Sequence, residues 1–287
     1  MKRRIIACAT LLMLAGPNVW AFQQSKASTN QSADTLLSHL PTDLKLKDDE
    51  IQRYKISVDY LQLDTLGNPL GKERVTGEYT RGLPDRKVRW NNVRIAKATT
   101  SDQLFPEGVP QTYMEGFTYV LSRRSDMLGK EFFPGFPDSE IKTKNLVWDM
   151  HMIEGFGWDH FSKLELNRPY AVQSGPEDVP LAGSGTFQNR RIELTWVGLS
   201  KRNDEVCALI QYRTFMNKFT TSMGTLSFQG RSHYWGDIWV SLKDKQIEYA
   251  TLFEDVLVEF KLPGQASKQY TGILRKGTFE KTGGVGK

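Results

Sequence analysis

The densest group of chemistry-bearing side chains lies in residues 148–160. If this stretch is helical, His151 and Glu154 are three residues apart on one face and can present a nitrogen and an oxygen to one metal ion. His160 and the distant His233 could complete such a site. A metal-assisted hydrolase that uses these four side chains is therefore one hypothesis.

Other features of this segment favour a packing role. It lacks the His-Glu-x-x-His motif that holds zinc in many hydrolases. Gly155 and Gly157 are expected to interrupt the helix that would position the ligands. Histidines also fall near carboxylates by chance, so packed or capping side chains are the default interpretation and no cofactor is expected.

A second group lies in residues 230–239. On a strand, His233, Trp235, Asp237 and Trp239 would share one face. A face that combines indole rings with a few polar groups can line a ligand cavity; the alternative is that both faces are covered and the rings only pack. The predicted cavity wall joins this strand to the helical segment and consists of Trp148, Met150, His151, Trp158, His233 and Trp235.

Other catalytic templates are incomplete. Residues 67–73 resemble a phosphate loop but are one residue short between the glycines and have Glu where Ser or Thr must bind magnesium. Residues 183–185 lack the first glycine of a nucleophile elbow. The carboxylates of Glu248, Glu254–Asp255 and Glu259 could hydrolyse a glycoside if two stood roughly 5 to 10 Å apart, but carboxylates at strand ends commonly face water.

The N-terminus reads as an export signal. Met1–Arg4 is basic, Ile5–Ala15 is almost entirely apolar, and Val19-Trp20-Ala21 offers small residues where a signal peptidase cuts. Cleavage near Ala21 predicts a periplasmic or secreted protein. The apolar run is shorter than the roughly 20 residues that span a bilayer, so no transmembrane segment is expected in the mature chain.

Removing the signal changes the composition. Without Lys2, Arg3 and Arg4, the 38 basic residues become 35 against 33 acidic ones, and the formal charge falls from +5 to +2. No basic stripe remains that could neutralise phosphates, so a nucleic-acid partner is not expected. Cys207 becomes the one remaining cysteine, and its apolar, strand-like setting predicts a buried thiol.

Hydrophobic periodicity predicts helices in the middle of the chain and strands on both sides of it. Helical spacing covers residues 113–121, a helix capped by residues 138–140 carries Leu146, Val147, Met150 and Ile153, and a short turn or helix covers 158–164. Strands are expected at 54–63, 72–80 and 86–98, with a bulge at Asn91–Asn92. Later strands are expected around 192–196 and at 206–215, 225–230, 232–242, 246–253, 252–262 and 270–279.

These elements predict an α+β fold that is mainly β. A curved antiparallel sheet, a barrel or half-barrel, would pack on two or three central helices. The expected organisation is a signal peptide at 1–21, a flexible segment at 22–45, a single β-rich domain at 46–280 with a helical insertion at about 112–165, and a flexible tail at 281–287. In shape this resembles the half-barrel envelope proteins that carry lipids or lipoproteins, without a motif that assigns membership.

The main hypothesis is an exported, non-enzymatic binding or carrier protein for an apolar or amphipathic ligand. Its expected partners are a lipid or another apolar small molecule, and an envelope protein. The alternatives are the metal-assisted hydrolase that uses His151, Glu154, His160 and His233, and a scaffold or interaction protein of the envelope.

Overall fold

Thirteen strands pair into one antiparallel sheet in the computed structural model, which describes residues 33–47, 49–121, 127, 129–138, 140–223, 226–262, 264 and 267–283. The expected export signal at 1–21, residues 22–32 of the expected flexible segment and residues 284–287 of the expected tail lie outside the described residues. The strands are β1 (Gln52–Leu63), β2 (Pro69–Leu83), β3 (Lys87–Ala98), β4 (Val109–Pro110), β5 (Phe117–Val120), β6 (Tyr170–Ala171), β7 (Glu177–Pro180), β8 (Gly185–Asn189), β9 (Arg191–Arg202), β10 (Glu205–Met223), β11 (Leu226–Ser241), β12 (Ile247–Phe260) and β13 (Gln269–Thr282).

The sheet runs in the order β4-β3-β2-β1-β13-β12-β11-β10-β8-β7. β5 pairs with β3, and β9 pairs with the first half of β10 and with β6. Because β1 pairs with β13, the first and last long strands of the chain are neighbours in the middle of the sheet. Within the described residues the two edges of the sheet do not pair with each other, so the sheet is open.

Alternating apolar residues explain the first three long strands, which confirm the predicted ones. In β1, Tyr54, Ile56, Val58 and Tyr60 are buried on the inner face. The predicted bulge at Asn91–Asn92 is present as a register shift between β2 and β3, with Asn92 at a φ of +52°.

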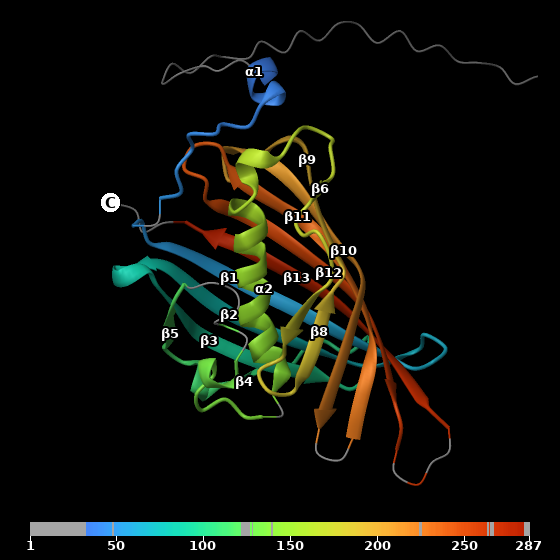
Figure 1. Ribbon diagram of the computed structural model, residues 1–287. Coiled ribbons are helices and arrows are strands. Elements are labelled where there is room, and N and C mark those ends of the chain that lie inside the picture. The colour runs from blue at the N-terminus through green and yellow to red at the C-terminus, as the bar shows by residue number, and fades with distance from the viewer. Residues whose placement is uncertain are drawn as a thin grey trace, which may run out of the picture. The chain divides into compact units, whose positions relative to one another are not determined.

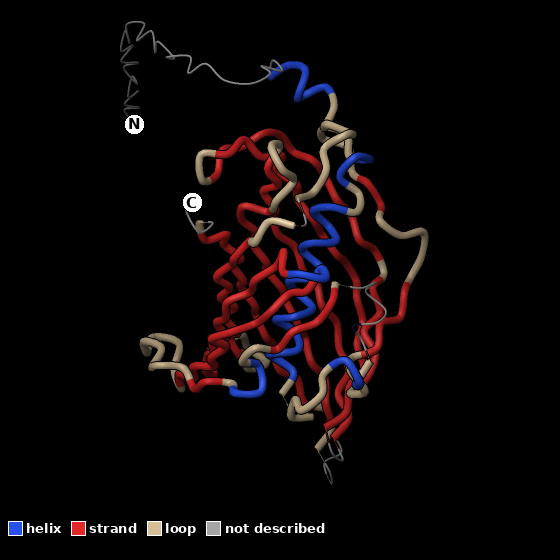
Figure 2. Tube along the Cα trace, turned by 90° about the vertical axis from the view of Figure 1, so that its left-hand side faces the viewer, coloured by secondary structure: helices blue, strands red, loops and turns tan. Residues whose placement is uncertain are grey.

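One 18-residue helix, α2 (Ile141–Trp158), lies along the inner face of the sheet in both views of the molecule (Figures 1 and 2). Its first turn is capped by the Glu140 carboxylate, which accepts a hydrogen bond from the Lys142 amide at 3.0 Å. Leu146, Val147 and Ile153 are completely buried. The predicted helix around these residues is confirmed.

The prediction of an α+β fold with two or three central helices is wrong. The described chain is mostly strand, and α2 is the one helix that packs along the sheet; α1 (Ala33–Ser38) is a six-residue helix before β1. Residues 113–121, predicted as a helix, form a 3-10 turn at Thr112–Met114 followed by β5. Gly116 at a φ of +71° breaks the helical spacing, and pairing with β3 favours the extended chain.

Further 3-10 turns within the described residues lie at Pro84–Arg86, Lys130–Phe132 and Phe161–Lys163. The last of these falls in the segment predicted as a short turn or helix. Among the described helices, none combines the length and the apolar character that a membrane crossing requires.

Gly155 and Gly157 do not interrupt α2, in contrast to the prediction. A Cβ atom on Gly157 would lie 3.2 Å from Ile247 Cδ1 on β12, so the absence of a side chain lets the helix approach the sheet closely. The packing energy gained by this approach offsets the lower helix propensity of glycine, which costs about 1 kcal/mol relative to alanine.

Candidate functional site

A cavity of about 540 Å³ lies between the N-terminal half of α2 and the inner face of the sheet. This volume falls in the range of roughly 300–1,000 Å³ that is usual for small-molecule sites. The apolar part of the wall opposite the helix includes Val179, Leu181, Phe187, Phe219, Phe228, Leu252, Val256, Val258 and Ile273. The helix contributes Ile141, Lys142, Asn145, Trp148, Asp149, His151 and Met152.

A bulge in β10 brings part of this wall to the inner face. Before the bulge the inward residues are even-numbered, as at Tyr212 and Thr214. The register against β11 shifts between Thr214 and Asn217, and Met216, at a φ of +57°, is 63% exposed. After the shift the inward positions are odd-numbered, which brings Phe219 and Thr221 into the cavity wall.

The strand register orders the wall from a charged end to an apolar end. Tyr234, Glu254 and Arg275 are side by side on β11, β12 and β13. The next two rows toward the strand ends are Ser232–Val256–Ile273 and Gly230–Val258–Thr271. The four residue steps from Arg275 to Thr271 span about 13 Å at the usual rise of a strand.

The charged end is a buried cluster of three ionisable side chains. Arg275 donates hydrogen bonds to the carboxylates of Glu254 on β12 and Asp149 on α2. Ser232 Oγ donates to Glu254 Oε1 at 2.5 Å, and the Arg275 guanidinium lies 5.0 Å from the centre of the Tyr60 ring. Asp149, Glu254 and Arg275 are only 7%, 8% and 9% exposed. Charges this deeply buried persist only when they are paired.

The cluster contains two carboxylates and one guanidinium. Burial raises the pKa of Asp149 to about 6; the charge of Arg275 opposes this change and that of Glu254 adds to it. Asp149 Oδ2 accepts the bond from Arg275, whereas Oδ1 accepts no hydrogen bond from the described residues. Burial also raises the pKa of the neighbouring Tyr60 to about 12, so this phenol remains protonated. The cavity therefore has an apolar body and a polar end, at which Asp149 Oδ1 can accept a hydrogen bond.

Two of the six residues predicted for a cavity wall line this cavity. They are Trp148 and His151, on α2. The Trp148 indole Nε1 donates to the backbone oxygen of Met127 at 2.9 Å, and its ring packs edge-on against Phe133 at 5.5 Å. These contacts fix the orientation of the ring.

The other four predicted wall residues lie elsewhere. Met150 is buried in the core, and Trp158, at the far end of α2, donates to the Lys245 backbone oxygen at 2.8 Å. His233 and Trp235 are on the outer face of β11, since Ser232 and Tyr234 occupy the inner face. Trp235 is 44% exposed.

The four residues of the metal hypothesis are in different environments. His151 lines the cavity, whereas Glu154 accepts a hydrogen bond from the Tyr79 hydroxyl at 3.0 Å and lies 3.7 Å from Arg81 Nε. The His160 ring lies 5.4 Å from the Tyr170 ring, and His233 is on the outer face. In the part of the chain that the structure describes, no group of three or more His, Cys, Asp or Glu side chains could hold a metal ion.

The sequence interpretation missed the charged end of the cavity. The sequence pattern places Glu254 only among carboxylates that could hydrolyse a glycoside, and it assigns no role to Arg275. The signal that could have found them is a charge at an inward position: Arg275 alternates with Ile273 and Gly277, and Glu254 alternates with Leu252 and Val256. This signal appears only after the inner face of each strand has been assigned.

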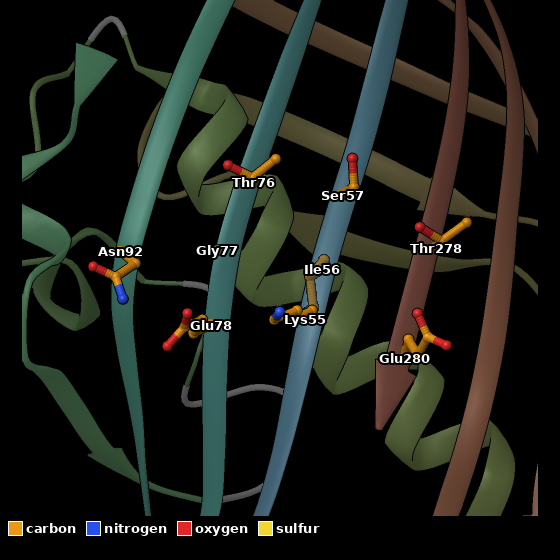
Figure 3. A pocket seen from close by; sticks show the side chains of 9 residues that line it. All are labelled: Lys55, Ile56, Ser57, Thr76, Gly77, Glu78, Asn92, Thr278 and Glu280. Atoms are coloured by element: carbon orange, nitrogen blue, oxygen red, sulfur yellow. The ribbon is translucent and has the colours of Figure 1, made fainter. Parts of the chain in front are cut away.

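A second hollow, of about 320 Å³, lies on the outer face over β1, β2, β3 and β13. Figure 3 shows Ser57, Thr76 and Thr278 on the side of the strands away from α2, whereas Ile56, which also borders the hollow, belongs to the inner face. Lys55 is the register neighbour of Glu78 on one side and of Glu280 on the other. Mixed charges of this kind on an open sheet face are typical of a solvated surface.

Comparison with known proteins does not assign this chain to a family. No family model matches the chain, and no curated protein matches it. One solved structure with a similar arrangement is described as "Lipid-protein interactions in lipovitellin"; it is 11% identical over 83% of this chain, with a TM-score of 0.39. This chain spans 26% of the length of that one. A TM-score at this level does not establish a shared fold.

Proposed function

We propose that this protein binds an apolar or amphipathic small molecule in the cavity between α2 and the sheet, and that it acts as a carrier or binding protein. The observation that carries the proposal is the cavity of about 540 Å³, with its long apolar wall and one charged end. As part of the proposal, the export expected from residues 1–21 would place this binding in the periplasm or outside the cell.

The wall suits an extended apolar chain. Phe187, Phe219, Phe228 and Val258 line its apolar end together, and burying a hydrocarbon chain against them gains about 25 cal/mol per Å² removed from water. Thr221 and Thr271 are the polar strand residues near that end. An apolar probe should therefore enter without leaving many polar groups unpaired.

A cavity-filling substitution tests the proposal. Val256→Trp places an indole in the cavity, whereas Leu257→Trp places the same ring on the outer face, at a residue that is 38% exposed. The two positions are adjacent on β12 and point to opposite faces. They therefore form a matched pair in which the same indole is introduced on the two faces of one strand.

The measurement is titration of the purified protein with N-phenylnaphthylamine, a neutral dye that fluoresces when it leaves water. The unmodified protein and Leu257→Trp should bind the dye alike, and Val256→Trp should bind it at least about tenfold more weakly, a loss of about 1.4 kcal/mol. Circular dichroism confirms folding of both variants. Equal dye binding by the two folded variants, or no binding to the unmodified protein, would exclude the cavity as the site.

A further inference from the structure

The charged end of the cavity has one more carboxylate than it has cations. Asp149 and Glu254 share the single guanidinium of Arg275, which leaves a formal charge of −1 on groups that are at least nine-tenths buried. A buried charge without a partner is costly. A ligand that brings a positive charge to this end of the cavity therefore gains binding free energy by pairing with the unbalanced carboxylate.

The other cation of the wall does not balance this charge. Lys142 is seven residues before Asp149 on α2, a distance of about 10 Å along the helix axis. Its Nζ lies 2.9 Å from the Glu73 carboxylate on β2, so it already has an acidic partner. Asp149, Glu254, Arg275 and Lys142 are the Asp, Glu, Lys and Arg side chains that line the cavity in the described structure, and His151, Tyr60 and Tyr234 are its other titratable groups.

Among the acceptors of the cluster, one oxygen can take a further hydrogen bond; the buried Arg275 Nε has no acceptor among the described residues. Both oxygens of Glu254 and one oxygen of Asp149 already accept a bond, whereas Asp149 Oδ1 accepts none from the described residues. A ligand can therefore add a donor at Oδ1. A carboxylate headgroup offers no donor and would bring a third negative charge into the cluster.

We propose that the ligand of this cavity is an amphipath with a primary ammonium group, which binds Asp149 and Glu254 beside Arg275 while its hydrocarbon chain lies along Ile273, Val256 and Val258. This assignment rests on the proposed function of the cavity and adds the headgroup and the direction of binding. An ammonium group supplies both the missing positive charge and the hydrogen-bond donor.

The test compares three headgroups on one chain length: decylamine, decanol and decanoate, each titrated into the unmodified protein by displacement of N-phenylnaphthylamine. At about pH 8 the amine is protonated and Asp149, whose pKa is about 6, is ionised. Decylamine should bind at least about tenfold more tightly than decanoate, with decanol between them. Equal affinities for decylamine and decanol would overturn the role of charge, and tightest binding of decanoate would overturn the direction of binding.

Two variants locate the headgroup. Asp149→Asn keeps the size of the side chain and an oxygen that can accept from Arg275, and it should reduce the preference for decylamine over decanoate at least about fivefold. Asp255→Asn, the same change on the outer face of β12, where Asp255 pairs with Arg231 at 3.3 Å, should leave that preference unchanged. An effect of Asp255→Asn as large as that of Asp149→Asn would place the headgroup outside the cavity and overturn the proposal.

The outcomes separate this inference from the proposed function. If none of the three compounds and no dye binds, the cavity is not a binding site and both fail. If the dye and all three compounds bind without the expected order, the cavity function stands and the ammonium headgroup is wrong. The headgroup series needs only the unmodified protein, so it decides the question even if Asp149→Asn does not fold.

Discussion

Asp149 on α2 and Arg275 on β13 form a buried ion pair that joins the long helix to the middle of the sheet. The same guanidinium also holds Glu254 on β12. A second buried pair, Glu154 with Arg81 on β2, lies farther along the same helix. The helix is thus attached through charged groups to strands on both sides of β1, and the cavity lies beside the first of these attachments.

Removing Arg275 should strongly destabilise the protein. Arg275→Met keeps much of the side-chain volume but leaves two buried carboxylates without their cation, which costs about 3–5 kcal/mol. The matched control is Arg231→Met, because Arg231 pairs with Asp255 at 3.3 Å on the outer face with both side chains more than 40% exposed. That change should cost less than about 1 kcal/mol. Urea unfolding of both variants measures the difference, and equal losses would contradict a special role for the buried pair.

The raised pKa of Asp149 predicts a pH-dependent stability. The carboxyl has a pKa of about 6 when folded and an ordinary value of 3.8, so the folded state holds this proton more tightly. Its stabilising contribution is therefore complete below about pH 4 and is lost as the pH rises through 6.

Asp149→Asn removes this titration and isolates its effect. From about pH 4 to pH 7, the free energy of unfolding of the unmodified protein should fall by about 2 kcal/mol relative to that of the variant. Urea unfolding of the two proteins at both pH values measures the change. If the free energies of unfolding of the two proteins differ by the same amount at both pH values, the pKa of Asp149 is not raised in the folded state.

The two glycines of α2 should respond oppositely to substitution. At Gly155 an added Cβ would lie 3.5 Å from Asp159 Oδ2, an ordinary contact, so Gly155→Ala should stabilise by about 0.5–1 kcal/mol. At Gly157 the space is filled by Ile247, and Gly157→Val should destabilise by about 1–3 kcal/mol. Thermal unfolding distinguishes them, and stabilisation by both would mean that the helix does not approach β12 as closely as described.

Cys207 should be unreactive in the folded protein. The side chain is buried on β10, and burial raises the pKa of its thiol to about 12. Because the thiolate is the reactive form, the thiol should react with Ellman's reagent only after unfolding. The mature chain should then release one equivalent of the chromophore in denaturant, and rapid reaction without denaturant would contradict the burial of Cys207.

Export should remove the first 21 residues. Expression of the full chain in a bacterium, followed by intact-mass analysis of the protein outside the cytoplasm, should give a mature chain that begins at Phe22. Ala21→Arg should block cleavage, since signal peptidase requires a small residue there, whereas Gln23→Arg, on the other side of the cut, should allow it. A cytoplasmic chain that retains Met1 would contradict the export prediction.

Much of the strand content follows from the sequence because period-2 alternation is a local signal. The alternation from Tyr54 to Tyr60 defines β1 and its inner face, and the apolar repeat around Leu146 defines α2. The lengths of the strands are harder to predict from the sequence. The two segments predicted at 225–230 and 232–242 form one strand, β11. Continuous pairing with β12 carries the chain through Gly230 and Arg231, and sequence alone does not show that partner.

Two segments have a secondary structure that differs from their local helix propensity. Residues 113–121 have helical spacing but include β5, because pairing with β3 satisfies their backbone groups. Gly155 and Gly157 reduce helix propensity but lie within α2, and at Gly157 the close approach to Ile247 stabilises the helix. In both cases a tertiary contact outweighs a propensity of about 1 kcal/mol or less per residue.

For the candidate site, the sequence by itself determined that Trp148 and His151 lie on one helix. The apolar repeat of that helix also predicted that one of its faces packs against a core. It did not determine the partners of that helix. Asp149, Glu254 and Arg275 are far apart in the chain and meet only because β12 pairs with β13 and α2 crosses their inner face. Periodicity reports which face of an element is buried, whereas the cavity and its charge depend on which buried faces meet, and that is decided by strand order, register and the bulge in β10.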